Sequence, residues 1–177
     1  VRDCGLAAGA SEVKLIEEPM AAAIGSGLDV QSARGCMILD IGGGTTEAAV
    51  ISLFGIVHCE AVRIGGHAFD SAIVDYVRKR FNLTIGEPSA ERVKIEIGSA
   101  LRGLSQKTAR VRGIDFSTGL PREVEITSDQ VHEALEPLLK EIVRTTHLAL
   151  ERTPPDLLAD VIENGITIAG GGALLNG

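Results

Sequence analysis

Residues 39–52 read LDIGGGTTEAAVIS, in which three consecutive glycines follow an apolar run and an aspartate. The run CMILD, at 36–40, is short and apolar, as is typical of a central strand. The segment after the glycines is rich in β-branched residues and partly alternates, so it predicts a second strand. A turn at 54–55 and a third strand over 56–64 follow. The sequence therefore predicts an antiparallel meander with the glycines at its first turn.

The glycine triplet at 42–44 does not fit either of two familiar phosphate-binding loops. A P-loop requires a lysine after its last glycine, and no lysine follows this triplet or the second one at 170–172. A dinucleotide-binding turn opens a helix, whereas this turn opens a strand. A glycine hairpin can still present several backbone amides to one anion, because no Cβ blocks the approach. The alternative is a tight hairpin that binds nothing.

The second triplet lies in AGGGALL, at 169–175. Packing at a strand–helix junction explains it as well as ligand binding does, but together with the first triplet it suggests the second lip of one nucleotide cleft. Asp40, at a strand end, is placed to hold Mg²⁺ through water, since this ion usually keeps several waters. Thr45 and Thr46 could orient a water or contact a phosphate.

Apolar spacing and turn residues predict the remaining elements. The expected helices cover 1–10, 19–28, 69–81, 88–101 with Ser89 as N-cap, 128–153 with a bend at Pro137, and 154–165. The expected strands cover 11–17, two within 108–127, and a buried one at 166–169. We expect residues 1–64 and 126–177 to form one α/β unit, with 65–125 inserted as a smaller α+β subdomain. The first residues look like the end of a helix, so we expect a piece of a longer protein.

Composition limits the function classes. The chain has 177 residues, of which 45% are apolar and 23% charged, an ordinary globular balance. Only 3% are aromatic and the net charge is −7, so nucleic acid is a poor partner. Isolated Cys4, Cys36 and Cys59 suggest small buried side chains in a reducing compartment. No apolar run reaches membrane-spanning length and no signal peptide is visible, so we expect a cytoplasmic protein.

The chain resembles the MreB family of bacterial actin-like, rod-shape-determining proteins over nearly its whole length. Six motifs occur in the family's order: LIEEPMAAAIGSGL, LDIGGGTTEAAVIS, RIGG…FD, AERVKIEIGSA, STGLPRE and AGGGALL. The glycine motif is shared with the wider actin, heat-shock chaperone and sugar-kinase superfamily, whereas the glutamate–proline helix start and AERVKIEIGSA are specific to MreB. The resemblance implies the α/β actin-like ATPase fold, which is ribonuclease H-like, with a mixed sheet in its larger subdomain. It also implies that this chain is the second half.

The resemblance further implies roles for single residues. Asp40 would lie behind the metal ion and its waters, Thr45 would sense the γ-phosphate, and Glu18 would position or activate the attacking water. The hairpin around the β- and γ-phosphates would consist of Gly42, Gly43 and Gly44. Glu91 and Lys94 would contact the ribose and adenine. The loop under the adenosine and α-phosphate would consist of Gly170, Gly171 and Gly172.

Taken without the resemblance, some of these residues have simpler explanations. Glu18 could be a helix-start carboxylate that the macrodipole favours, with Glu17 its nearest rival. Glu91 and Lys94, three apart on a helix, could be a surface ion pair. The chain departs from the family pattern in two places: His67 and Ala68 stand where acidic residues are usual, and Ala169 stands where a threonine is common. The histidine either ties this corner of the cleft to pH or lies on the surface.

The function implied is a filament-forming hydrolase of ATP, or of GTP, with ATP or ADP and Mg²⁺ as ligands. It would self-associate at the inner face of the cytoplasmic membrane, organise cell-wall synthesis and maintain rod shape. The alternatives are a non-polymerising chaperone-type ATPase and a sugar or acetate kinase of the same superfamily. We expect no turnover from this chain alone, because catalysis needs groups on both walls of the cleft.

Overall fold

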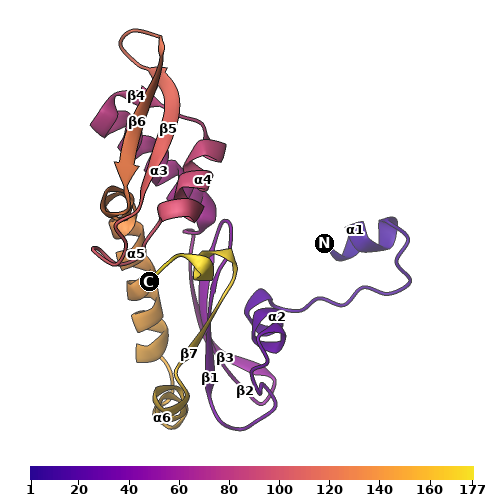
Figure 1. Ribbon diagram of the computed structural model, residues 1–177. Helices are drawn as coiled ribbons and strands as arrows, with labels where there is room; N and C mark the ends of the chain where they lie inside the picture. The colour runs from indigo at the N-terminus through magenta and orange to yellow at the C-terminus, as the bar shows by residue number, and fades with distance from the viewer.

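The predicted meander forms the first of two sheets in the computed structural model, which covers residues 1–177 (Figure 1). Strand β1 (Cys36–Ile41) pairs antiparallel with β2 (Thr46–Ser52), and β2 pairs antiparallel with β3 (Gly55–Val62). On its other side β1 pairs parallel with β7 (Ile166–Ala169). The sheet is therefore mixed, with strand order β3-β2-β1-β7.

Helices cover both faces of this sheet, which explains the apolar run of β1. Helix α2 (Glu18–Gly25) packs against one face, where Ile38 and Ile51 are fully buried. Helix α5 (Ser128–Glu151) lies along the opposite face, over β2 and β3. Alternate residues of each central strand thus enter two different cores.

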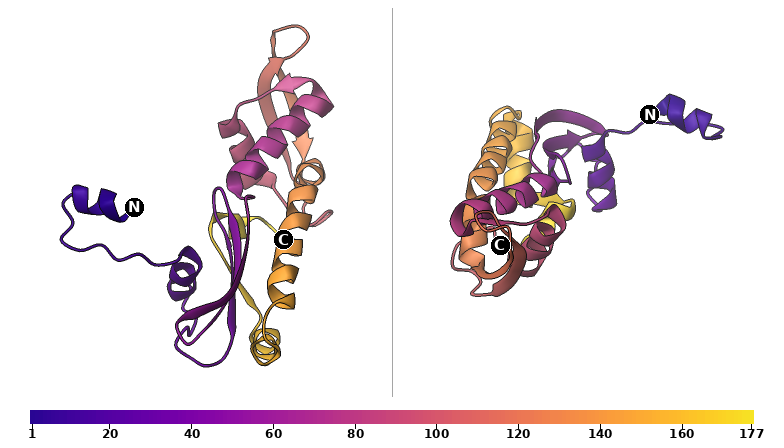
Figure 2. Two further views of the ribbon diagram at one scale, coloured as in Figure 1. Left: turned by 180° about the vertical axis from the view of Figure 1, so that it is seen from behind. Right: turned by 90° about the horizontal axis from the view of Figure 1, so that it is seen from above.

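A smaller sheet lies at the other end of the elongated molecule (Figures 1 and 2). Its strand order is β4-β5-β6, all antiparallel. The strands are β4 (Leu83–Thr84), β5 (Thr108–Asp115) and β6 (Pro121–Thr127), and the helices beside them are α3 (Gly66–Phe81) and α4 (Glu87–Ile97). One core of 20 buried residues, which includes Phe69, Val93 and Leu135, runs from this end into the first sheet.

Helix α5 joins the two ends. It begins with a capping box, in which Thr127 and Gln130 satisfy each other's backbone amides. Pro137 lies inside the helix as predicted. The division into 1–64 with 126–177 and an inserted 65–125 stays a prediction.

Several sequence predictions are wrong. Cys4 and Cys59 are exposed and Cys36 is half-buried, so none of the three is a buried side chain. Residues 11–17 form no strand, because no other segment offers its backbone hydrogen bonds a partner, and Leu15 and Ile16 are exposed. Helix α4 starts at Glu87 with Gly86 as N-cap and ends at Ile97, so Ser89 is an internal residue. Strand β7 is a half-exposed edge rather than a buried strand.

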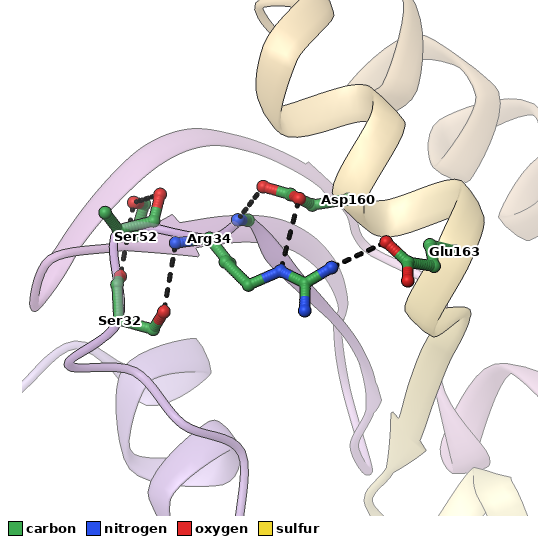
Figure 3. Close-up of polar contacts among 7 residues, drawn as sticks. Ser32, Arg34, Ser52, Asp160 and Glu163 are labelled. Carbon is green, nitrogen blue, oxygen red and sulfur yellow. Dashed lines mark hydrogen bonds and ion pairs between the residues drawn. The ribbon is translucent and has the colours of Figure 1, made fainter.

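The far end of the first sheet is closed by a turn and a polar cluster. The β2–β3 turn is formed by Leu53 and Phe54, both with positive φ, one residue earlier than predicted. Beside it, Arg34 forms ion pairs with Asp160 and Glu163 of helix α6 (Pro155–Asn164), at 3.4 and 2.5 Å (Figure 3). The amide of Gly35 also donates to Asp160, at 2.8 Å. These contacts fix the loop that leads into β1.

The two ends of the chain lie in different places. Helix α1 (Arg2–Ala7) and the extended segment after it project away from the body (Figure 1). The carboxyl end instead forms a 3₁₀ turn, η1 (Gly171–Leu174), at the junction between the two sheets. None of the helices is both long and apolar enough to cross a membrane.

Candidate functional site: a cleft between two glycine triplets

The first triplet closes the β1–β2 turn and leaves a row of amides free. The amide of Gly42 donates to the carbonyl of Thr45, at 2.9 Å, so it is used by the turn itself. The next three amides, of Gly43, Gly44 and Thr45, have no hydrogen-bond acceptor in the protein. Consecutive unpaired amides of this kind can bind one anion. The unpaired amides therefore run from Gly43 to Thr45, and Gly42 of the predicted hairpin does not contribute one.

The carbonyls of the same turn face the start of helix α3. The amides of Gly66 and His67 donate to the carbonyls of Gly42 and Gly43, each at 2.9 Å. A methyl group added to Gly65 would lie 2.5 Å from the carbonyl oxygen of Gly42 and 2.8 Å from that of Gly43. Gly65 is therefore required for the turn and the helix to meet, whereas a methyl group on Gly66 would meet nothing closer than 3.5 Å.

The second triplet packs directly on the end of β1. Gly170 has φ +82°, and a methyl group there would overlap the carbonyl oxygen of Ile41 and lie 2.5 Å from Asp40 Oδ1. A methyl group on Gly172 would overlap the side chain of Ile41. Gly171 between them has open space around its Cα. Two of these three glycines are thus explained by packing.

A cavity of about 390 Å³ lies between the triplets, the start of α3 and the middle and last turns of α4. At one end its wall is formed by Gly42, Gly43, Gly66 and His67, where the turn meets α3. Its apolar lining includes Ile95, Leu174 and Leu175. The remaining lining residues are Phe69, Asp70, Glu91, Lys94, Gly171 and Gly172. Glycine amides and apolar side chains around one cavity suit a ligand that has both an anionic and a flat apolar part.

Lys94 forms an ion pair inside this wall, but its partner is Asp70 rather than Glu91. Its Nζ lies 2.8 Å from Asp70 Oδ1, with the two side chains 16% and 8% exposed. The contact is an ion pair without a well-directed hydrogen bond to Oδ1, and the ammonium donates instead to the carbonyl of Gly66, at 3.1 Å. Lys94 thereby ties α4 to the first turn of α3.

Three carboxylates form a second group, which does not line the cavity. Asp40 and Glu47 are paired across β1 and β2, and Glu18 starts helix α2. Burial raises the pKa of the Glu47 carboxyl, and the negative charges of Glu18 and Asp40 raise it further. One oxygen of Glu47 is buried without a hydrogen-bond partner. A cation nearby would relieve this repulsion.

The structure brings some of the predicted site residues together and separates others. Gly42, Gly43, Glu91, Lys94, Gly171 and Gly172 line the cavity. Thr46 does not, because it is fully buried and its hydroxyl donates to the carbonyl of Ile64, at 2.8 Å. Sequence reasoning missed Asp70 as the partner of Lys94, since nothing in the chain marks a contact between residues 24 apart.

A mixed sheet with a glycine hairpin at its first turn, a second glycine loop beside it and a cleft between them defines an actin-like fold. Similarity to known proteins places the chain within that class. The family model described as MreB/Mbl protein matches residues 1–177. The chain therefore belongs to the MreB/Mbl family.

Named relatives agree with this assignment. The chain is 52% identical over 175 residues to the cell shape-determining protein MreB of Escherichia coli K12, and covers 50% of it. It is 41% identical over 177 residues to the cell shape-determining protein Mbl of Bacillus subtilis 168, and covers 53% of it. Nearly all of this chain is matched in both cases, at 99% and 100%. The chain thus spans about half the length of these relatives.

Solved structures match the fold closely. The MreB5 of Spiroplasma citri bound to AMPPNP superposes with a TM-score of 0.94 at 37% identity, over 98% of this chain and 52% of that one. The MamK double helical filament matches with a TM-score of 0.70 at 23% identity, over 91% of this chain and 47% of the MamK chain. This match supports the fold alone. The predicted actin-like α/β fold is confirmed.

Proposed function

We propose that this chain supplies one wall of the nucleotide site of a filament-forming bacterial actin homologue, which hydrolyses ATP and maintains cell shape. The observation that carries the proposal is the row of three unpaired amides at residues 43–45, which begins at Gly43 in the wall of a cavity of about 390 Å³ that also has an apolar lining. Two solved MreB5 structures, bound to AMPPNP and to ADP, have the same fold.

The parts of the cleft suit the parts of a nucleotide. The amides of Gly43, Gly44 and Thr45 would bind the β- and γ-phosphates, where charge develops during phosphoryl transfer. The base would pack against Ile95, Leu174 and Leu175, with Glu91 facing the ribose. Lys94 would hold the wall in place, because its ammonium is already paired with Asp70. The loop 170–172 would close the cleft beneath the adenosine.

The carboxylates beside β1 would serve a metal ion and a water. The chain has no group of three or more side chains arranged to hold a metal directly, which agrees with Asp40 acting through water. Mg²⁺ would neutralise phosphate charge when bound. Glu18 would orient the attacking water, since it starts α2 near Asp40 and Glu47. Thr45, at the end of the turn, would contact the γ-phosphate.

The remaining roles rest on the family. The protein would self-associate into filaments at the inner face of the cytoplasmic membrane and guide cell-wall synthesis. Catalysis would require the other wall of the cleft, which the longer relatives have room to supply. The alternatives are a chaperone-type ATPase and a sugar kinase with the same fold, neither of which forms filaments.

The test uses the full-length protein. Assembly with ATP and Mg²⁺ is followed by light scattering, and phosphate release is measured in parallel. We expect wild type to assemble and release phosphate, and Glu18→Gln to assemble while releasing phosphate at least about a hundredfold more slowly.

The matched control is Glu17→Gln, which removes a neighbouring exposed carboxylate before the first helical residue. It should behave like wild type. Hydrolysis without assembly at any salt concentration or on any lipid would contradict the filament proposal. Equal rates for both variants would remove Glu18 from the mechanism.

A further inference from the structure

His67 lies in the wall of the cleft, beside the turn that we propose binds phosphate. Its amide donates to the carbonyl of Gly43, at 2.9 Å. Its ring also lies beside this glycine, because a methyl group added to Gly43 would lie 3.3 Å from Nε2 of His67. The residue is exposed, and its side chain makes no hydrogen bond or ion pair within the protein. An imidazole with two free nitrogens therefore faces the cavity.

The other charged groups of the wall give it an excess of negative charge near His67. Helix α3 contributes Asp70, and helix α4 contributes Glu91 and Lys94. The β1–β2 turn and the segment after β7 contribute glycines and leucines but no titratable side chain. Two carboxylates and one ammonium give this wall a net negative charge while His67 is neutral. Since Lys94 is paired with Asp70, the wall has no free cation for an anionic ligand.

We propose that His67 is a binding residue for the nucleotide, and that its protonated ring donates a hydrogen bond to a phosphate oxygen beside Gly43. This inference rests on the proposed nucleotide site. A charged donor binds phosphate more strongly than a neutral one, and histidine changes charge between pH 5 and 8. Protonation of His67 also cancels the net charge of the wall. Nucleotide affinity therefore falls as the pH rises across this range.

The experiment measures ADP binding by the full-length protein with Mg²⁺, by calorimetry at pH 6 and pH 8. Wild type should bind about fivefold more weakly at pH 8, which is the difference between a charged and a neutral hydrogen bond. His67→Asn keeps a neutral donor and should bind weakly at both pH values. His67→Arg keeps a cation and should bind tightly at both. Titration of ADP itself is common to all three proteins and cancels in the comparison.

The matched control is His147→Asn, on the exposed surface of α5 and outside the cavity. It should keep the wild-type pH response, and thermal unfolding should show that every variant folds. A wild type that binds ADP with the same pH response as His67→Asn would overturn the role of His67 and leave the nucleotide site standing. A wild type that binds no nucleotide at either pH would overturn the proposed function, and this inference with it.

Discussion

The two glycine triplets of this chain are alike in sequence and differ in what they do. In the second triplet, Gly170 and Gly172 have no room for a side chain, because the end of β1 fills the space. In the first triplet an added methyl group meets nothing closer than 3.3 Å, and around Gly44 there is no atom within 4 Å. Packing therefore explains two glycines of the second triplet, Gly170 and Gly172, whereas the fold alone does not explain the first triplet.

The two triplets thus illustrate two reasons for a glycine, close packing and open space around the backbone. At Gly170 the positive φ and the approach of Asp40 and Ile41 make glycine a condition of folding. At Gly43 and Gly44 the backbone amides are unpaired, and the surroundings of Gly44 are open, so we propose that glycine there keeps space free for a ligand. Substitutions of Gly170 and Gly172 should thus reduce stability, and substitutions in the first triplet should reduce binding.

The largest effect is expected from Gly170→Ala in the full-length protein. The new methyl group would clash with backbone and with Asp40 at a strained φ, so we expect the free energy of unfolding to fall by about 2–4 kcal/mol. Gly171→Ala is the matched control, since its methyl group would enter open space, and should cost less than about 1 kcal/mol. Urea denaturation measures both. Equal losses would show that the two triplets do not differ in this way.

The next effect concerns the support of the first triplet. Lys94→Met would leave the buried carboxylate of Asp70 without its cation, and we expect a loss of about 2–3 kcal/mol in unfolding free energy. Adding Asp70→Asn should restore most of it. Glu96→Gln, which breaks the half-exposed pair with Arg92 on the same helix, should cost about 0.5 kcal/mol. A double variant that is no more stable than Lys94→Met would contradict the ion pair between Lys94 and Asp70.

A smaller effect is expected from Gly44→Ala, which should change ligand binding and leave stability nearly unchanged. The methyl group meets no protein atom, so stability should change by less than about 1 kcal/mol. It would stand beside the free amides, and we expect ADP affinity to fall about tenfold, which corresponds to about 1.4 kcal/mol. Calorimetry on the full-length protein measures this. An unchanged affinity together with an unchanged stability would mean that the open space serves no ligand.

The smallest effect is a pH dependence from Glu47, which lies behind the first triplet. Its carboxyl has a raised pKa in the folded state, so the folded protein holds this proton more tightly than the unfolded chain does. Stability contributed by the proton is present below the ordinary value of 4.5 and is lost as the pH rises through the raised pKa.

Glu47→Gln removes this loss. The free energy of unfolding of the variant, relative to wild type, should therefore increase with pH across that window in buffer without Mg²⁺. The exposed Glu125 provides the control, as Glu125→Gln should give a flat difference. A flat difference for Glu47→Gln as well would contradict the carboxylate group that we describe.

Much of the fold could be predicted from local signals. The apolar run 36–40 and the β-branched residues after the glycines predicted the hairpin, and apolar spacing predicted α3 and α5. The failures needed information from elsewhere in the molecule. Residues 11–17 have a strand-like pattern but no neighbour to pair with, and β7 is apolar yet lies at an edge of the sheet.

The site was predictable in outline and not in detail. The motifs predicted which loops meet, and the cavity contains six of the predicted residues. They did not reveal that the amide of Gly42 is used by the turn, that Thr46 is buried, or that Lys94 pairs with Asp70. Each of these depends on contacts between separate segments, which a single sequence does not specify.

The most direct test of the account is a crystal structure of the full-length protein with a non-hydrolysable ATP analogue and Mg²⁺. We predict phosphate oxygens within hydrogen-bond distance of the amides of Gly43, Gly44 and Thr45, and the base against Ile95 and Leu174. An analogue bound elsewhere, with these three amides facing only water, would contradict the central claim that the first triplet is kept open for phosphate.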